Sequence, residues 1–168
     1  MLISVNDKIN FNDFNDEELI SVYAEWIKEL KIRNIIRTSN IVGEIGEYLA
    51  INYYNKTAGL PKLVPAAIST KSVDAISSNG ERYTIKTVTT NTTGVFYGID
   101  SFENKLFEKV IIIQLDKKFE LKRIIEIDWK IFYQFKHWHS RMQAYNINIT
   151  KDLINNSKII FSKEVVRD

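Results

Sequence analysis

Apolar residues in the first third of the chain recur at the spacing of an α-helix. Asn15 and Glu18 stand three residues apart, in the arrangement of a capping box, so a helix is expected to start there. Its apolar positions are Leu19, Tyr23, Trp26, Ile27 and Leu30. A second helix is expected to start after Asn40 and to end ahead of Pro61. The residues expected on or near its inner side are Ile41, Ile45, Tyr48, Leu49 and Tyr53.

The middle of the chain changes to the two-residue period of β-strands. Residues 72–77 and 82–88 alternate apolar and polar positions around Ser78-Asn79-Gly80, which predicts a hairpin. Residues 95–99 are expected to form a further strand. The run Val110-Ile111-Ile112-Ile113 is typical of a strand buried on both faces, here residues 109–115, and residues 119–127 follow as its hairpin partner.

The last part of the chain returns to helical signals. Asp128 is expected to cap a helix that begins at Trp129, a short helix is expected near Arg141, and Thr150 is a further candidate cap before a strand at residues 159–161. Helices, then strands, then helices predict a single α/β domain over residues 1–168, with a mixed central sheet flanked by helices. Its core is expected at about residues 39–127, with the terminal regions as additions.

Composition excludes several classes of protein. Without cysteine, the chain has no disulfide framework, cysteine-ligated metal site or thiol nucleophile. It has no apolar run near the ~20 residues that cross a bilayer and no secretory signal pattern at its start, so a cytoplasmic protein without a membrane partner is expected. The net charge of +2 permits a nucleic-acid partner without requiring one. His137 and His139 have no third histidine or cysteine to complete a zinc site.

The predicted hairpin carries an acid and a base. A two-residue turn would mix polar and apolar side chains on both of its faces, whereas a three-residue turn with Gly80 in the left-handed conformation gives one apolar face. The pattern therefore favours the longer turn, which unites Asp74, Thr84 and Lys86 on the other face. Phosphodiester hydrolysis uses such a pairing of a metal-binding carboxylate with an ammonium. A surface hairpin with one solvated acid and one solvated base is the alternative.

Asp74, the hairpin, and then Thr84-Ile85-Lys86 resemble the PD-(D/E)XK, restriction-endonuclease-like nuclease superfamily. Upstream, the stretch Gly43-Glu44-Ile45-Gly46-Glu47-Tyr48-Leu49-Ala50 is similar to the first core helix of its Mrr-type and Holliday-junction-resolvase-like branches. The order of helix, Asp strand, Lys strand and buried strand also matches. The resemblance covers about residues 39–127 and implies a restriction-endonuclease-like core.

The resemblance also implies a role for each matched residue. Asp74 would be the principal ligand of Mg²⁺ or Mn²⁺, the backbone carbonyl of Ile85 would complete the metal shell, and Lys86 would position or activate the hydrolytic water. Glu47 matches the helix glutamate of the family best, with Glu44 as the second choice; ordinary helix-surface acids are the alternative for both.

Two positions depart from the family's pattern. Val73 stands where the family name has Pro, a harmless change. Thr84 stands where an acidic residue is expected, and a threonine hydroxyl is a poor Mg²⁺ ligand beside a carboxylate. Glu47 would have to compensate for the missing acid.

The expected function is a divalent-metal-dependent DNA endonuclease acting in restriction or repair. The cations expected to contact DNA are Lys71, Arg82, Lys136 and Arg141, with Trp138 and Tyr145 interleaved near the last two. A catalytically inactive DNA-binding subunit with the same fold is the alternative, and a protein-interaction module would make the Asp74–Lys86 alignment accidental. A cutter of duplex DNA with one site per chain has to pair, so a homodimer or a subunit of a restriction or defence complex is expected.

Overall fold

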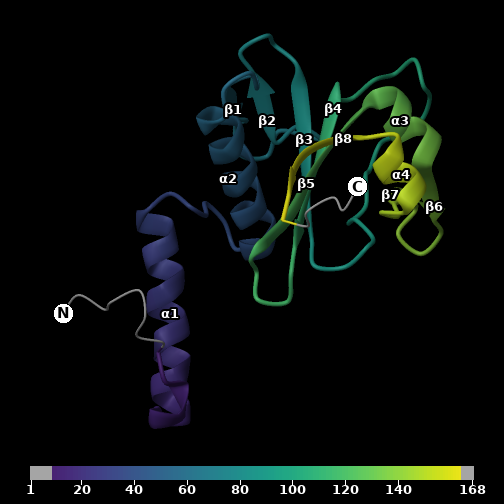
Figure 1. Cartoon of the computed structure of the whole chain (residues 1–168). Helices are drawn as coiled ribbons and strands as arrows, with labels where there is room; N and C mark the ends of the chain where they lie inside the picture. The colour runs from purple at the N-terminus through teal and green to yellow at the C-terminus, as the bar shows by residue number, and fades with distance from the viewer. Residues whose placement is uncertain (1–8, 164–168) are drawn as a thin grey trace. The chain divides into compact units, whose positions relative to one another are not determined.

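The structure of the protein is a computed structural model, and residues 9–163 are described. The chain divides into two compact units, residues 1–39 and 40–168. Figure 1 labels their helices and strands. Within the described range, no helix combines the length and apolar character needed to cross a membrane.

The first unit contains a short 3₁₀ helix, η1 (Phe11–Asp13), and one long helix, α1 (Asp16–Ile32). The predicted capping box is confirmed: the side chain of Asn15 accepts a hydrogen bond from the Glu18 amide, and the Glu18 carboxylate accepts one from the Asn15 amide, both at 2.9 Å. This reciprocal bonding fixes where α1 starts, because it satisfies two backbone donors that lack partners inside the helix. No side chain of α1 is buried.

The second unit is a mixed α/β fold built on a six-stranded sheet in the order β1-β2-β3-β4-β5-β8. Only β3 and β4 run parallel, and the other neighbours are antiparallel. The strands are β1 (Leu63–Pro65), β2 (Ala75–Ser77), β3 (Arg82–Val88), β4 (Lys109–Leu115), β5 (Leu121–Asp128) and β8 (Lys158–Ser162). The other elements are α2 (Ile41–Lys56), α3 (Trp129–Phe135), α4 (Lys151–Asn155) and a separate hairpin of β6 (Lys136–His139) and β7 (Ala144–Ile147).

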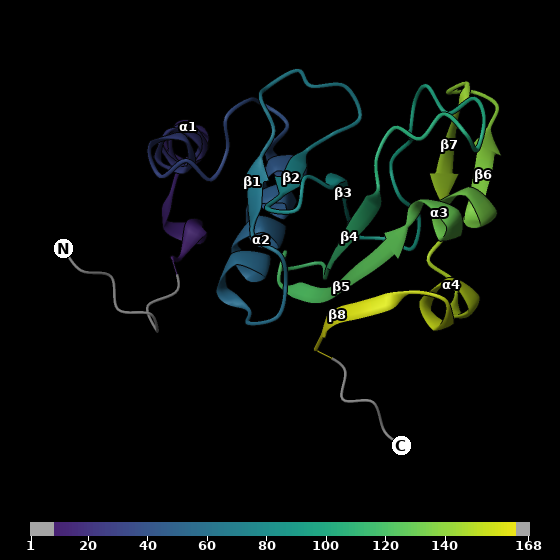
Figure 2. The same cartoon turned by 90° about the horizontal axis from the view of Figure 1, so that it is seen from above.

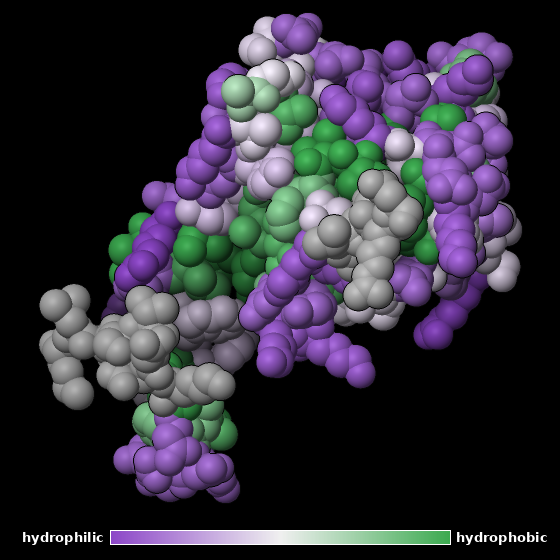
Figure 3. All heavy atoms as spheres, viewed as in Figure 1, coloured by the Kyte–Doolittle hydropathy of each residue, from purple (hydrophilic) through white to green (hydrophobic). Residues whose placement is uncertain are grey.

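The central strand β4 separates two apolar clusters. Ile111 and Ile113 belong to the cluster beneath α2, while Val110 and Ile112 belong to the cluster on the opposite face, and all four are fully buried. Figure 2 shows α2 on one side of the sheet and α3, α4 and the β6–β7 hairpin on the other. A strand covered on both faces can be apolar at every position, which explains the uninterrupted run in the sequence. On the face drawn in Figure 3, apolar side chains gather in the middle and polar side chains surround them.

The strands predicted from the strongest patterns are confirmed, and several weaker predictions are wrong. The bounds of β3 and β4 match, and β4 pairs with β5 as expected. Residues 95–99 form no strand. Within this stretch only Phe96 has a β-type partner, Tyr145, in a single isolated bridge. No helix forms near Arg141, which lies in the turn of the β6–β7 hairpin. The short strand β1 was not predicted.

Helix α2 packs against β3 through a glycine. Of the residues expected on or near its inner side, Leu49 and Tyr53 pack against the apolar cluster beneath it. Its buried residues are Glu44, Gly46, Ala50 and Tyr54. Tyr48, expected on the inner side, is exposed. A Cβ at Gly46 would lie 1.7 Å from Oγ1 of Thr87, so the close approach of helix and strand requires glycine there. The hydroxyl of Thr87 also donates a hydrogen bond to the Gly43 carbonyl, at 3.3 Å.

The other end of α2 is held by a buried polar network. The hydroxyl of Tyr54 donates to the carboxylate of Glu126 on β5 at 2.6 Å, and Lys109 on β4 lies 3.5 Å from the same carboxylate. Burial, reinforced by the negative charge of Glu126, raises the pKa of Tyr54 above its usual range. The hydroxyl therefore stays protonated and keeps donating to a carboxylate that is itself buried.

We expect Gly46→Ala to destabilise the protein by roughly 1–3 kcal/mol, because the added methyl group has to displace a β-branched side chain on a central strand. Urea unfolding followed by circular dichroism measures the change. Gly94→Ala is the matched control, since a Cβ at Gly94 meets nothing within 4 Å. Equal stability of the two variants would contradict this account of the helix–sheet contact.

Candidate active site at the edge of strand β3

The β2–β3 hairpin has the three-residue turn that the hydrophobic pattern favours. Ala75 pairs with Tyr83, the Ser77 amide donates to the Glu81 carbonyl at 2.9 Å, and Gly80 has a φ of +81°. Ala75 and Tyr83 are buried in the cluster beneath α2. The residues that alternate with them along the strands therefore face the opposite side of the sheet, as predicted.

The carboxylate of Asp74 is bonded directly to strand β3. Its Oδ2 atom accepts a hydrogen bond from the Ile85 amide at 2.6 Å and another from the Thr84 hydroxyl at 3.0 Å. Both bonds use the same oxygen, and among the described residues Oδ1 receives none. One carboxylate oxygen is therefore fixed by the protein while the other is left for a ligand.

The edge of β3 is open beyond this point, because β2 pairs with β3 only up to Asp74, whose amide donates to the Tyr83 carbonyl at 2.8 Å. The preceding chain leaves the sheet, with Ser72 at a φ of +61°. In a strand, the amide and carbonyl of one residue point to the same edge. The Ile85 amide faces Asp74, so its carbonyl points to the same open edge as the Asp74 carboxylate.

Lys86 brings a positive charge to this group from the same strand. Its side chain is partly buried, and desolvation lowers the pKa of the ammonium, while the negative charges of Asp74 and Glu47 act in the opposite direction. Its Nζ lies 4.9 Å from the centre of the Phe96 ring. The ammonium of Lys86 thus lies against an aromatic ring, and two carboxylates act on it electrostatically.

Of the acids in α2, Glu47 is the one whose negative charge acts to raise the pKa of Lys86. Glu47 is half-buried, whereas Glu44, the second choice from the sequence, is only 6% exposed in the first turn of the helix.

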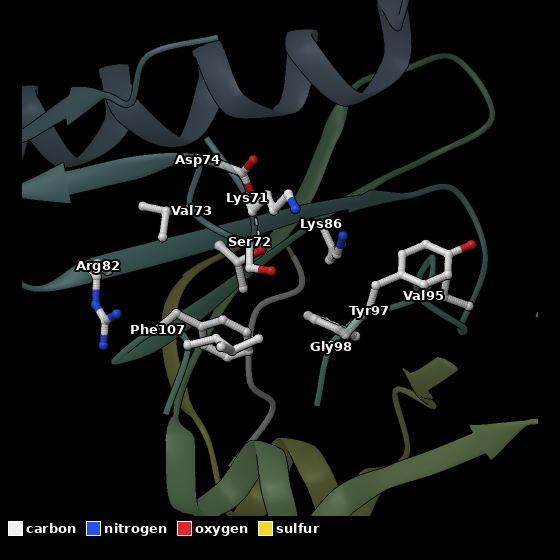
Figure 4. Close-up of a pocket in the computed structure, with 13 residues that line it drawn as sticks. Lys71, Ser72, Val73, Asp74, Arg82, Lys86, Val95, Tyr97, Gly98 and Phe107 are labelled. Atoms are coloured by element: carbon white, nitrogen blue, oxygen red, sulfur yellow. Dashed lines mark hydrogen bonds between the residues drawn. The ribbon is translucent and has the colours of Figure 1, made fainter. Parts of the chain in front are cut away.

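Part of this group lines a pocket of about 750 Å³, and the residues that line it include neither Glu47 nor Ile85. Asp74, Thr84 and Lys86 line it together, and so does Lys71. Figure 4 shows Lys71 and Lys86 near Asp74, and Arg82 farther away from these three. An apolar wall is contributed by Phe96, Tyr97, Leu106 and Phe107. The charged groups of the pocket are therefore less open to solvent than they would be on a flat surface.

The sequence pattern missed this wall. Phe96 and Tyr97 lie in a loop and Phe107 precedes β4, so no period marks them as a group. The glycines at positions 94 and 98 are a signal that could have indicated a loop rather than a strand.

Arg82 is already engaged by a carboxylate of its own chain. Its Nε and Nη2 atoms donate to the two oxygens of Glu108 at 3.0 and 2.8 Å, and its amide donates to Glu108 at 2.6 Å. A two-pronged ion pair of this kind fixes the arginine fork. Arg82 therefore clamps the start of β3 to the residue before β4.

Lys136 and Arg141, the other predicted DNA contacts, lie outside the pocket on the β6–β7 hairpin. The structure therefore brings Asp74, Thr84 and Lys86 together in one pocket and leaves two of the four predicted DNA contacts on a separate surface.

The donors at the open edge suit a hard divalent cation. The carboxylates of Asp74 and Glu47 and the Ile85 carbonyl all offer oxygen, the ligand type that Mg²⁺ and Mn²⁺ prefer. Across residues 9–163, no group of three or more His, Cys, Asp or Glu side chains is arranged to hold a metal ion. A Mg²⁺ ion held by Asp74, Glu47 and the Ile85 carbonyl would fill the remainder of its shell with water and substrate oxygens.

Comparison with known proteins adds no family. No protein-family model matches the chain, and no curated protein matches its sequence.

We expect Glu108→Gln to lower stability at pH 7 by about 1 kcal/mol, allowing for the partial exposure of the ion pair. The hydrogen bonds from Arg82 hold the pKa of Glu108 at about 2, against 4.5 in the unfolded chain. A depressed pKa stabilises the fold above pH 4.5, and this contribution is lost as pH falls toward 2. Unfolding free energies of the wild type and the variant should therefore converge between these values. Glu103→Gln, at an exposed position nearby, is the control, and a gap that stays constant with pH would contradict the ion-pair account.

Proposed function

We propose that this protein is a divalent-metal-dependent DNA endonuclease with a restriction-endonuclease-like core, acting in restriction or repair. The observation that carries the proposal is the group of polar residues at the edge of β3. There Asp74, bonded to the Ile85 amide, shares a pocket with Lys86, and Glu47 acts on the same lysine. A carboxylate, a backbone carbonyl and an ammonium at one open edge are suited to phosphodiester hydrolysis.

The chain order around the site supports the same proposal. Helix α2, the Asp74 hairpin strand, the Lys86 strand and the buried parallel strand β4 follow one another in the order that the resemblance requires. The register adds support, because Asp74 and Thr84 face one another only with the three-residue turn.

In this proposal Asp74, Glu47 and the Ile85 carbonyl hold Mg²⁺ or Mn²⁺. When bound, such an ion supplies a Lewis acid that polarises the phosphate and acidifies water. Lys86 orients the attacking water and offsets the charge that develops on the phosphate. Thr84 is a positioning residue, because its hydroxyl donates to Asp74 and keeps the carboxylate turned toward the site.

One observation favours a second candidate function. Thr84, where the family pattern has an acid, uses its hydroxyl on Asp74, so the site has a donor in place of a second strand carboxylate. A protein with this fold that binds DNA without cutting it, as a subunit of a larger complex, accounts for that replacement.

We expect Asp74→Asn and Lys86→Met each to reduce cleavage of plasmid DNA at least about 100-fold, because general acid–base and electrostatic contributions of this kind typically reach 10²–10⁴. The Asn side chain keeps an oxygen that accepts from Ile85, and Met keeps the apolar stem beside Phe96. Plasmid nicking is measured with Mg²⁺, with Mn²⁺ and with EDTA, alongside DNA binding by anisotropy.

The controls remove the same charges from exposed positions, with Lys117→Met in the β4–β5 turn and Asp16→Asn at the start of α1. Wild-type protein that binds DNA but leaves the plasmid intact with either metal establishes the non-cutting alternative. Cleavage that survives Asp74→Asn and Lys86→Met would overturn the site itself.

We expect Thr84→Val to lower cleavage about tenfold while Thr84→Ser retains it, because serine keeps the donor to Asp74 and valine keeps only the shape. Rate constants with saturating DNA measure the effect, since a positioning residue changes the rate of the reaction more than the affinity. Equal rates for valine and serine would show that packing alone matters at this position.

A further inference from the structure

The β6–β7 hairpin and its flanks carry a segment without negative charge. Residues 129–151 contain no Asp or Glu, although the whole chain has 21 of them. The cations in this segment are Lys130, Lys136, Arg141 and Lys151, accompanied by His137 and His139. Such a separation of charge creates a local field that attracts a polyanion even when the net charge of the protein is small.

Aromatic rings line one face of this hairpin. Trp138 on β6 pairs with Tyr145 on β7, and their rings meet edge-to-face with 5.0 Å between centres. The ammonium of Lys136 lies 4.2 Å from the centre of the Tyr145 ring and 4.0 Å from that of Tyr133. We name these four residues the aromatic strip. Trp138, at its end, is 52% exposed, so a broad ring face is open to solvent.

The aromatic strip is connected to the candidate active site through one residue. The Phe96 amide donates to the Tyr145 carbonyl at 2.6 Å, and the Tyr145 amide donates back at 3.2 Å. The ring of Phe96 lies in the pocket, 4.9 Å from the ammonium of Lys86. Phe96, itself buried, therefore joins the backbone of the strip to the wall of the pocket.

We propose that the aromatic strip binds single-stranded DNA and presents an unpaired stretch of the substrate to the pocket. Exposed rings stack on unpaired bases, which a duplex hides in its interior, while flanking cations contact the backbone phosphates. Lys136 is held between two rings and Arg141 lies in the turn, so the cations accompany the stacking surface. The assignment of DNA rests on the proposed function, whereas the preference for a single strand rests on the strip.

The test measures binding in EDTA, so that no cleavage interferes. Fluorescence anisotropy compares a labelled oligothymidylate of about 20 nucleotides, longer than the roughly 4–16 that one such site covers, with a duplex of equal length. We expect tighter binding of the single strand. Trp138→Ala should weaken it about tenfold or more, and Trp138→Phe should retain most of it, since stacking contributes that much per base. Trp26→Ala, which removes an exposed tryptophan from α1, is the matched control.

A second variant covers the case in which Trp138→Ala disturbs the hairpin. Arg141→Gln in the exposed turn should reduce the slope of log affinity against log salt by about 0.7, the value for one phosphate of a single strand. Preference for the duplex, an unchanged slope, or loss of binding in Trp26→Ala equal to that in Trp138→Ala would overturn the proposal. Tighter binding of oligouridylate than of oligothymidylate would overturn the choice of DNA. Binding of the single strand without plasmid cleavage would leave the strip established and reject only the nuclease activity.

Discussion

The hydrogen bond from the Ile85 amide to the Asp74 carboxylate, at 2.6 Å, is the interaction on which the candidate site depends. Strand β2 stops before it can pair with this part of β3, and a buried backbone donor without a partner would be costly. The side chain of Asp74 takes the place that a neighbouring strand would occupy. The rest of the β3 edge therefore stays unpaired. The carbonyl of Ile85 points to this edge, and Lys86 supplies a positive charge from the same strand.

The two-sided burial of β4 makes that open edge tolerable. Apolar clusters cover both faces of the sheet, so its stability does not require β2 to be long. The irregular chain before β2 and the loop with Phe96 and Tyr97 lie on one side of the sheet, where together they line the pocket. Because the buried central strand keeps the sheet stable, polar groups can gather at its unpaired edge without weakening the core.

The sequence predicted the parts of the fold in which one strong period applies. The apolar run at positions 110–113 and the alternation in residues 82–88 gave correct strands, and the turn type followed from the requirement for one apolar hairpin face. The residues near Arg141 have no dominant period, and they form a hairpin because Trp138 and Tyr145 pair across it. For α2 the pattern correctly placed Leu49 and Tyr53 toward the sheet and wrongly placed Tyr48 there, because close contact at Gly46 determines which side of the helix comes nearest to the sheet. The electrostatic effect of Glu47 on Lys86 acts between two separate elements, so no local sequence pattern indicates it.

Helix α2 is held at two points, by the glycine contact with Thr87 near its start and by the bond from Tyr54 to Glu126 near its end. Glu47 lies between them in the chain. A slip of a single residue along the sheet would move the helix by about 1.5 Å and turn each side chain by about 100°. Two anchors that differ in chemistry, one steric and one hydrogen-bonded, cannot both be satisfied after such a slip. The two contacts therefore fix the register of the helix on the sheet, and with it the position of Glu47 along the helix axis.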